Sequence, residues 1–115
     1  MEKKEKSQLP DGITQEMIDD AKKKHGADKV KILDLPLNDE GTEYKSVLAV
    51  IPSRNVIGQF RRFMDNNPVK ADTILVKACV LSHVDEVLND DGLFLGAVSG
   101  LAELMPVRKA IVKNC

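Results

Sequence analysis

The sequence is poor in aromatic residues, with one Tyr, three Phe and no Trp among 115 residues. Proteins that bind single-stranded nucleic acid stack bases on aromatic side chains, so this scarcity argues against that kind of platform. The net charge is only −1, although 30% of the residues are charged, and it gives no general attraction to nucleic acid or to an anionic membrane. The core of the protein is therefore expected to be aliphatic.

The chain has only two cysteines, and their positions do not suggest a disulfide framework. Cys79 falls in an apolar helical pattern, and Cys115 is the last residue. No apolar signal segment opens the sequence, so we expect a cytoplasmic protein. Cys79 and His83 are one helical turn apart, but two ligands do not make a metal site and no further partner is placed to complete one. We predict no metal and no cofactor.

No catalytic motif is evident. His83, Asp85 and Glu86 are close enough in sequence for acid/base chemistry, but neither a candidate nucleophile nor a Gly-rich phosphate loop accompanies them. Neighbouring charges at a helix junction explain these residues more simply. We therefore expect a protein that is not an enzyme.

The length suits a single domain with one core. Residues 1–11 mix charges and small polar groups with too little apolar surface to offset the entropy cost of ordering, so they are predicted to be a disordered, charged lead. Residues 12–115 are predicted to form one α+β domain, in which a β-hairpin packs against a compact set of about four helices.

The first half of this domain contains one short helix and the hairpin. Thr14 is placed to cap a helix that Gly26 ends, because a left-handed residue stops a helix. Residues 30–32 and 44–51 are rich in β-branched and aliphatic side chains, and the turn-forming residues 36–41 join them. Two strands alone are marginal in water, so the free edge of the hairpin is a candidate interaction site.

A second helix is predicted from Ser53 to about Asp65, with an apolar side and a basic side. The basic side carries Arg54, Arg61 and Arg62. A solvated helix face is the ordinary explanation of such a cluster. Arg is also favoured at the rims of protein interfaces, and three Arg side chains can contact phosphates.

Residues 67–105 are the most apolar and most strongly periodic part of the chain. An Asn-Pro pair predicts a helix start at the beginning of this stretch, and the Asn-Asp-Asp at 89–91 predicts another. The helix that follows, residues 93–105, should end at Pro106. It is apolar nearly all round, so it is either wrapped by the rest of the fold or shared with a partner.

Gly92, Gly96 and Gly100 are spaced four apart in this last helix and leave a stripe without side chains. Each Gly within a helix costs up to about 1 kcal/mol relative to Ala, so the stripe requires a compensating close contact. Another helix of the same chain is one candidate for that contact, and a subunit or a client protein is the other. The predicted partner-binding surface adds a basic rim to this helix and consists of Arg61, Arg62, Leu93, Leu95, Gly96, Val98, Gly100, Leu101 and Met105.

The apolar run in this helix is too short to span a membrane, and Glu103 interrupts it, so we expect no membrane partner. Residues 107–115 alternate too weakly to assign. Three apolar residues at 110–112 lie between two Lys, and the segment is predicted to be either a short strand or a tail.

From Tyr44 onward the order of features is similar to that of a known family. A strand is followed by PSR opening a helix, by NNPVKADTILVKACVL, by the acidic break LNDDGLF and by the apolar helix LGAVSGLAELM. This order resembles the small tail assembly chaperones of long-tailed bacteriophages and prophages. The family offers no motif residues that can be carried over as sites.

The resemblance implies a cytoplasmic, non-enzymatic protein of a bacterium or a phage-infected host. Such a protein binds the long tape measure protein, keeps its hydrophobic helices from aggregating and helps to recruit tail tube subunits. It also tends to self-associate, so a homo-oligomer is expected. An apolar helix with a Gly stripe would accept an amphipathic client helix in a groove.

A small nucleic-acid-associated regulatory protein is the alternative function. It would use the face of Arg54, Arg61, Arg62 and Lys70, and its binding would weaken steeply with salt. Two Asp residues close to this face in the sequence reduce its positive charge. A protein client is therefore the preferred partner.

Overall fold

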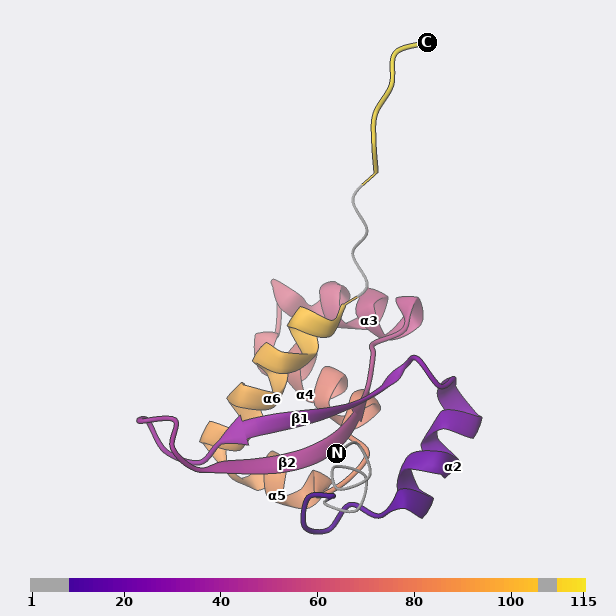
Figure 1. Cartoon of the computed structure of the whole chain (residues 1–115). Helices are drawn as coiled ribbons and strands as arrows, with labels where there is room; N and C mark the ends of the chain where they lie inside the picture. The colour runs from indigo at the N-terminus through magenta and orange to yellow at the C-terminus, as the bar shows by residue number, and fades with distance from the viewer. Residues whose placement is uncertain (1–8, 106–109) are drawn as a thin grey trace.

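The computed structural model describes residues 9–105 and 110–115 and confirms the predicted α+β class (Figure 1). The described part of the chain contains an antiparallel hairpin and five helices, one more than predicted because of the short α5. No described helix has both the length and the apolar character that crossing a bilayer requires. The elements in chain order are α2 (Gln15–His25), β1 (Val30–Pro36), β2 (Tyr44–Val50), α3 (Arg54–Met64), α4 (Pro68–Cys79), α5 (Val84–Asn89) and α6 (Asp91–Leu104).

The predicted disordered lead, residues 1–11, falls mostly outside the described residues, since these begin at Leu9. Residues 9–11 belong to the folded body. Leu9 packs against a small core, and the carbonyl of Pro10 accepts a hydrogen bond from the N–H of Ile13 at 3.1 Å. The boundary of the folded body is therefore earlier than the predicted residue 12.

The hairpin is longer than the sequence suggested, because β1 extends to the residues that were assigned to the turn. β1 and β2 pair over all seven residues of each strand. In the loop, the N–H of Leu37 donates to the carbonyl of Glu43 at 2.8 Å, and the side chain of Asn38 accepts from the N–H of Thr42 at 3.1 Å. The loop is therefore held by its own hydrogen bonds.

Side-chain caps begin the helices at the predicted places. Thr14, Ser53 and Asn67 each accept a hydrogen bond from the backbone N–H three residues on, at 3.1 to 3.3 Å. Asp90 begins α6 in the same way, at 2.9 Å. α2 ends at Gly26, whose φ of 107° is a conformation that residues with a side chain rarely adopt.

The main core lies between one face of the hairpin and the helices α4 and α6, and α2 covers part of the opposite face. Side chains alternate between the two faces along each strand. Both cores are aliphatic, as the composition predicted. The main core consists of Leu35, Val47, Ala49, Val50, Leu75, Val76, Cys79, Val80, Val87, Leu93, Ala97 and Leu101. The smaller core under α2 consists of Ile13, Ile18, Ala21 and Leu48.

The outer edge of β2 is closed by the segment that follows α4. Ala49 forms a bridge with Val80, and the carbonyl of Leu48 accepts from the N–H of Leu81 at 2.7 Å. The N–H of Leu48 donates to the buried Ser82 Oγ at 2.8 Å. The free edge that the sequence predicted is therefore the outer edge of β1.

The turn before α5 contains a residue in an unusual conformation. His83 has a φ of 56°, in the left-handed region, and its ring occupies the space that a Cβ on Gly12 would need. His83 Nδ1 lies 3.1 Å from Ser82 Oγ. This turn redirects the chain from the edge of β2 into α5, and no sequence pattern had predicted it.

Candidate functional site

The Gly stripe of α6 contacts the hairpin of the same chain. A Cβ on Gly100 would lie 3.4 Å from the methyl carbons of Leu33, and one on Gly96 would lie 3.8 Å from Pro36 Cδ. The intramolecular explanation therefore accounts for Gly96 and Gly100, although the neighbour is a strand and not the expected helix. Gly92 is exposed and meets no other element.

Two residues of the predicted partner-binding surface, Leu93 and Leu101, lie in the main core instead. Leu93 is 5% exposed and Leu101 is 0% exposed. Together with Ala97 they recur at four-residue steps, which places them on one side of the helix. Because that side faces the core, neither Leu is available to a partner, and the prediction is wrong at these two positions.

The opposite side of α6 is exposed and retains part of the predicted surface. Leu95 is 60% exposed, while Val98 and Met105 are half-buried against the main core. Leu95 is three residues from Gly92 and is therefore its neighbour on the helix surface. Leu95 is thus the apolar side chain that α6 offers most fully to a partner.

A shallow groove of about 360 Å³ lies between the hairpin loop and the first half of α6. Gly92 and Gly96 leave its helical wall without side chains, and Leu37, which is 52% exposed, adds apolar surface from the loop. Sequence reasoning missed Leu37, although an apolar residue among turn formers is itself a signal. The lining residues are Pro36, Leu37, Asn38, Asp39, Gly41, Gly92 and Gly96. We call these residues, together with Leu95, the loop-helix groove.

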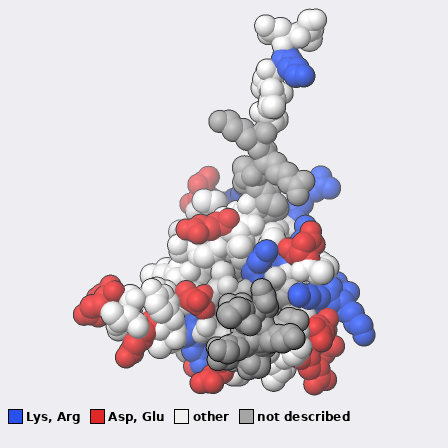
Figure 2. Space-filling view, viewed as in Figure 1, with Lys and Arg blue, Asp and Glu red and all other residues white. Residues whose placement is uncertain are grey.

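Acidic side chains surround the loop-helix groove. Asp39 lines it, Glu40 and Glu43 are exposed in the same loop, and Asp91 is exposed at the start of α6. Figure 2 shows acidic residues at the end of the molecule that the hairpin loop forms. Lys45, on the adjoining strand, is paired with a carboxylate of α5 at 3.2 Å. The groove therefore combines apolar surface with a negative field.

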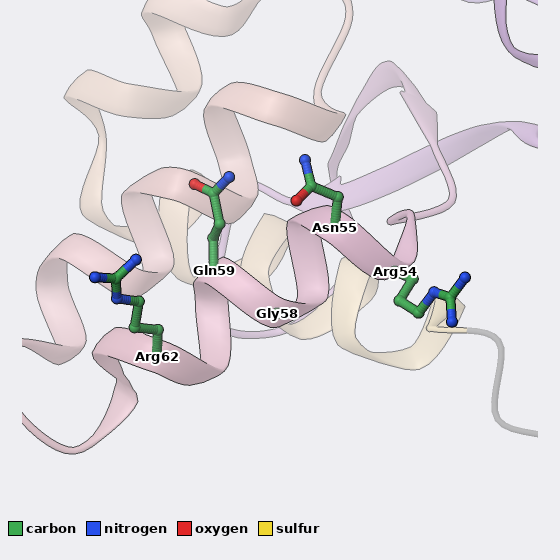
Figure 3. Close-up of a pocket in the computed structure, with 5 residues that line it drawn as sticks. All are labelled: Arg54, Asn55, Gly58, Gln59 and Arg62. Carbon is green, nitrogen blue, oxygen red and sulfur yellow. The ribbon is translucent and has the colours of Figure 1, made fainter.

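The predicted basic rim is not brought together with Leu95. Arg61 and Arg62 are exposed on α3, which packs mainly against α4. The hollow on the polar side of α3 has residues of this one helix as its lining and is correspondingly shallow. Its residues are Arg54, Asn55, Gly58, Gln59 and Arg62 (Figure 3).

Cys79 and His83 serve the packing of the fold. Burial raises the pKa of the Cys79 thiol to about 11, so the thiol is neutral near pH 7. The ring of His83 lies beside the Ser82 hydroxyl that closes the edge of β2. Across residues 9–105 and 110–115, no group of three or more His, Cys, Asp or Glu side chains is placed to hold a metal ion.

The fold of this protein is similar to that of a solved structure. No family model matches the sequence, and no curated protein matches it either. The solved structure of the uncharacterised protein rbstp2171 from Bacillus stearothermophilus is similar to this one, with a TM-score of 0.58. The two sequences are 20% identical, and the match covers 84% of this chain and 98% of that chain. At this identity the likeness shows that the two proteins share a fold.

Proposed function

We propose that this protein is a non-enzymatic assembly chaperone or adaptor that binds an amphipathic helix of a client protein in the loop-helix groove. The order of sequence features from Tyr44 onward favours a phage tail tape measure protein as the client and tail tube subunits as further partners. The observation that carries the proposal is a groove in which the exposed Leu37 faces Gly92 and Gly96, where α6 has no side chains, with the exposed Leu95 one helical turn from Gly92.

The shape of the groove suits the apolar ridge of a helix. Glycines allow a second helix to approach closely, and the Leu side chains offer it apolar contacts. Full burial of a Leu contributes about 1.5 to 3 kcal/mol. Since Leu37 and Leu95 are already about half-buried, a client would gain about 2 kcal/mol from completing the burial of both. Such binding is weak and reversible, as a chaperone that releases its client requires.

The acidic surroundings determine which amphipathic helix fits best. Asp39, Glu40 and Asp91 favour a client helix with Lys or Arg beside its apolar ridge. Exposed ion pairs contribute only about 0 to 1 kcal/mol each, so these charges act mainly on the association rate and on orientation. Their effect should weaken with salt.

Fluorescence anisotropy with two labelled synthetic peptides tests the proposal. Both peptides form an amphipathic helix with a Leu ridge, and they differ in having Lys or Glu beside the ridge. The Lys peptide should bind the full chain more tightly, and the difference should shrink as salt is added.

Variants of the protein locate the binding. Leu37→Ser and Leu95→Ser remove the apolar contact without adding charge, and each should weaken binding of the Lys peptide by about fivefold, which corresponds to about 1 kcal/mol. Val69→Ser is the matched control, because Val69 is an apolar residue of α4 that is 71% exposed and does not line the groove. Equal binding by all three variants would contradict the proposal.

The polar side of α3 supports a second candidate function, binding to a nucleic acid backbone. Arg54 and Arg62 are about 12 Å apart along the helix, on the same side as Asn55 and Gln59, and α3 contains no acidic residue. Lys70 adds charge nearby, although its ammonium lies over the Phe63 ring at 4.4 Å. Titration with duplex DNA and with RNA should then show binding that weakens steeply with salt. A flat titration would exclude this function.

A further inference from the structure

The outer edge of β1 carries backbone groups that face away from β2. In an antiparallel pair, alternate residues direct their N–H and C=O toward the neighbouring strand. The hydrogen bonds from Ile51 N–H to the Lys29 carbonyl and from Leu37 N–H to the Glu43 carbonyl identify the inward set as the odd-numbered residues. The residues that face outward are therefore Val30, Ile32, Asp34 and Pro36.

This outer edge is open in the described part of the chain. No other described residue forms a backbone hydrogen bond with Ile32 or Asp34. Ile32 is also 41% exposed, so apolar surface accompanies the free backbone groups. An unpaired strand edge is a template for pairing with another chain, and natural proteins usually cover it. The edge of β2, by contrast, is already closed by the segment at Val80.

Residues 110–115 have the features of a strand that would cover such an edge. They are extended, exposed throughout and lie outside the body of the protein (Figure 1). Ile111 and Val112 are 85% and 91% exposed, which makes them the most exposed large apolar side chains of the described residues. Both are β-branched and favour strands. This segment has a strand-like composition and an extended trace, and in a single copy it pairs with neither strand of the hairpin.

We propose that two copies of this protein exchange residues 110–115, so that the segment of each copy pairs with the outer edge of β1 of the other. The hairpin then becomes a three-stranded sheet, which is more stable in water than two strands. Because side chains alternate, Ile111 and Val112 lie on opposite faces of the sheet, and one of them packs beside Ile32. Lys113 adds a charge opposite to that of Asp34 on the same edge.

A second copy is the occupant that the structure favours. Residues 110–115 extend away from their own body (Figure 1), so the exposed Ile111 and Val112 are directed toward another molecule and not toward their own sheet. The exchange is also reciprocal, so each pair makes the contact twice and is closed by a twofold axis. A closed pair leaves neither outer edge of β1 free, so assembly stops at two copies.

Sedimentation velocity and native mass spectrometry of the full chain test the exchange. Reducing buffer prevents Cys115 from linking two copies. The wild type should be a pair of 12.7 kDa chains. A chain that lacks residues 110–115 should be a single copy, and so should Ile32→Pro, because Pro removes an N–H that faces outward without breaking the ladder to β2. Circular dichroism verifies that both variants keep their fold.

Mixing the two variants gives the sharper result. The shortened chain keeps an open edge and has no segment to lend, whereas Ile32→Pro keeps the segment and has a blocked edge. The mixture should therefore form a heterodimer, although each variant by itself stays a single copy. The amides of Ile32 and Asp34 in the shortened chain should exchange with deuterium at least tenfold more slowly within it.

Three results would overturn the exchange. A wild type that stays a single copy at high concentration would do so, and so would variants that both remain paired. A single-copy wild type whose Ile32 and Asp34 amides lose protection when residues 110–115 are removed would show that the segment pairs with its own β1. The peptide titration of the loop-helix groove does not depend on any of these outcomes.

Discussion

Gly100 on α6 lies directly against Leu33 on β1, at a distance where a Cβ on the glycine would be 3.4 Å from both Leu33 methyl carbons. The helix therefore settles on the strand at positions that lack side chains, and Leu93 and Leu101 are directed into the main core. The same geometry leaves Leu95 exposed on the opposite side of α6, while Gly92 lines the groove beside the hairpin loop. Packing of the fold uses Gly96 and Gly100, and the candidate site uses Gly92 and Gly96, so the two share Gly96.

Substitution of Gly100 tests this packing. Gly100→Leu should lower the free energy of unfolding by about 1 to 3 kcal/mol, because the larger side chain has to displace Leu33. Gly58 on α3 is the matched control, since nothing lies within 4 Å of a Cβ at that position. Gly58→Ala should raise the free energy of unfolding by up to about 1 kcal/mol through helix propensity alone. Urea denaturation measures both, and a Gly100→Leu variant as stable as the wild type would contradict the contact.

Gly12 and His83 should behave as a coupled pair. Gly12 has a φ of 81° and the His83 ring fills the space beside it, so Gly12→Ala should destabilise the fold by about 1 to 3 kcal/mol. In a His83→Ala background the cost of Gly12→Ala should be smaller, because the ring is gone and only the backbone strain remains. A double-mutant cycle measures the coupling. Strictly additive effects would show that the two residues do not interact.

Ser82 should matter more than its size suggests. Ser82→Ala leaves the N–H of Leu48 buried without its acceptor, which should cost about 1 to 3 kcal/mol of stability. Ser46→Ala is the control, because its hydroxyl donates to Asp34 Oδ1 at 2.6 Å in an exposed position. That loss should be within about 0.5 kcal/mol. Thermal or urea unfolding measures the loss of stability in each variant. Equal losses in Ser82→Ala and Ser46→Ala would argue against closure of the β2 edge by Ser82.

The buried Cys79 thiol should make the folded protein less stable at alkaline pH. Burial raises its pKa from 9.0 to about 11 in the folded protein, so the unfolded chain releases the proton first as the pH rises. The stabilising contribution is complete below pH 9 and is lost as the pH rises through 11, by about 3 kcal/mol in all. Urea denaturation between pH 8 and 11 measures the free energy of unfolding of the wild type and of Cys79→Ala. Over this range the wild type should lose more stability than the variant does, by most of that amount. Parallel pH profiles for the two proteins would refute the assignment.

Local patterns in the sequence predicted much of this fold. Thr14, Ser53 and Asn67 could be recognised as caps because a capping side chain bonds to the backbone only three residues away. The spacing of Gly96 and Gly100 also predicted a close contact, but spacing does not identify the element that makes it. That element is β1, a strand about sixty residues earlier in the chain.

The candidate site was harder to predict for the same reason. Helical periodicity shows that Leu93, Leu95 and Leu101 are apolar, and it does not show which of them faces the core when a helix is apolar nearly all round. Leu37 was missed because its role depends on where the loop lies relative to α6. The left-handed turn at His83 places its ring against Gly12, which is distant in sequence, and beside the adjacent Ser82. Neither contact follows a recognisable sequence pattern.

Nuclear magnetic resonance of the ¹⁵N-labelled full chain, during titration with the Lys-flanked Leu-ridge peptide, shows whether the loop-helix groove receives a client helix. We expect little change on the polar side of α3 and saturable shifts of the amides of Leu37, Asn38, Gly41, Gly92, Leu95 and Gly96. Shifts confined to α3, or no shifts in the hairpin loop and the first half of α6 at saturating peptide, would contradict binding in the groove.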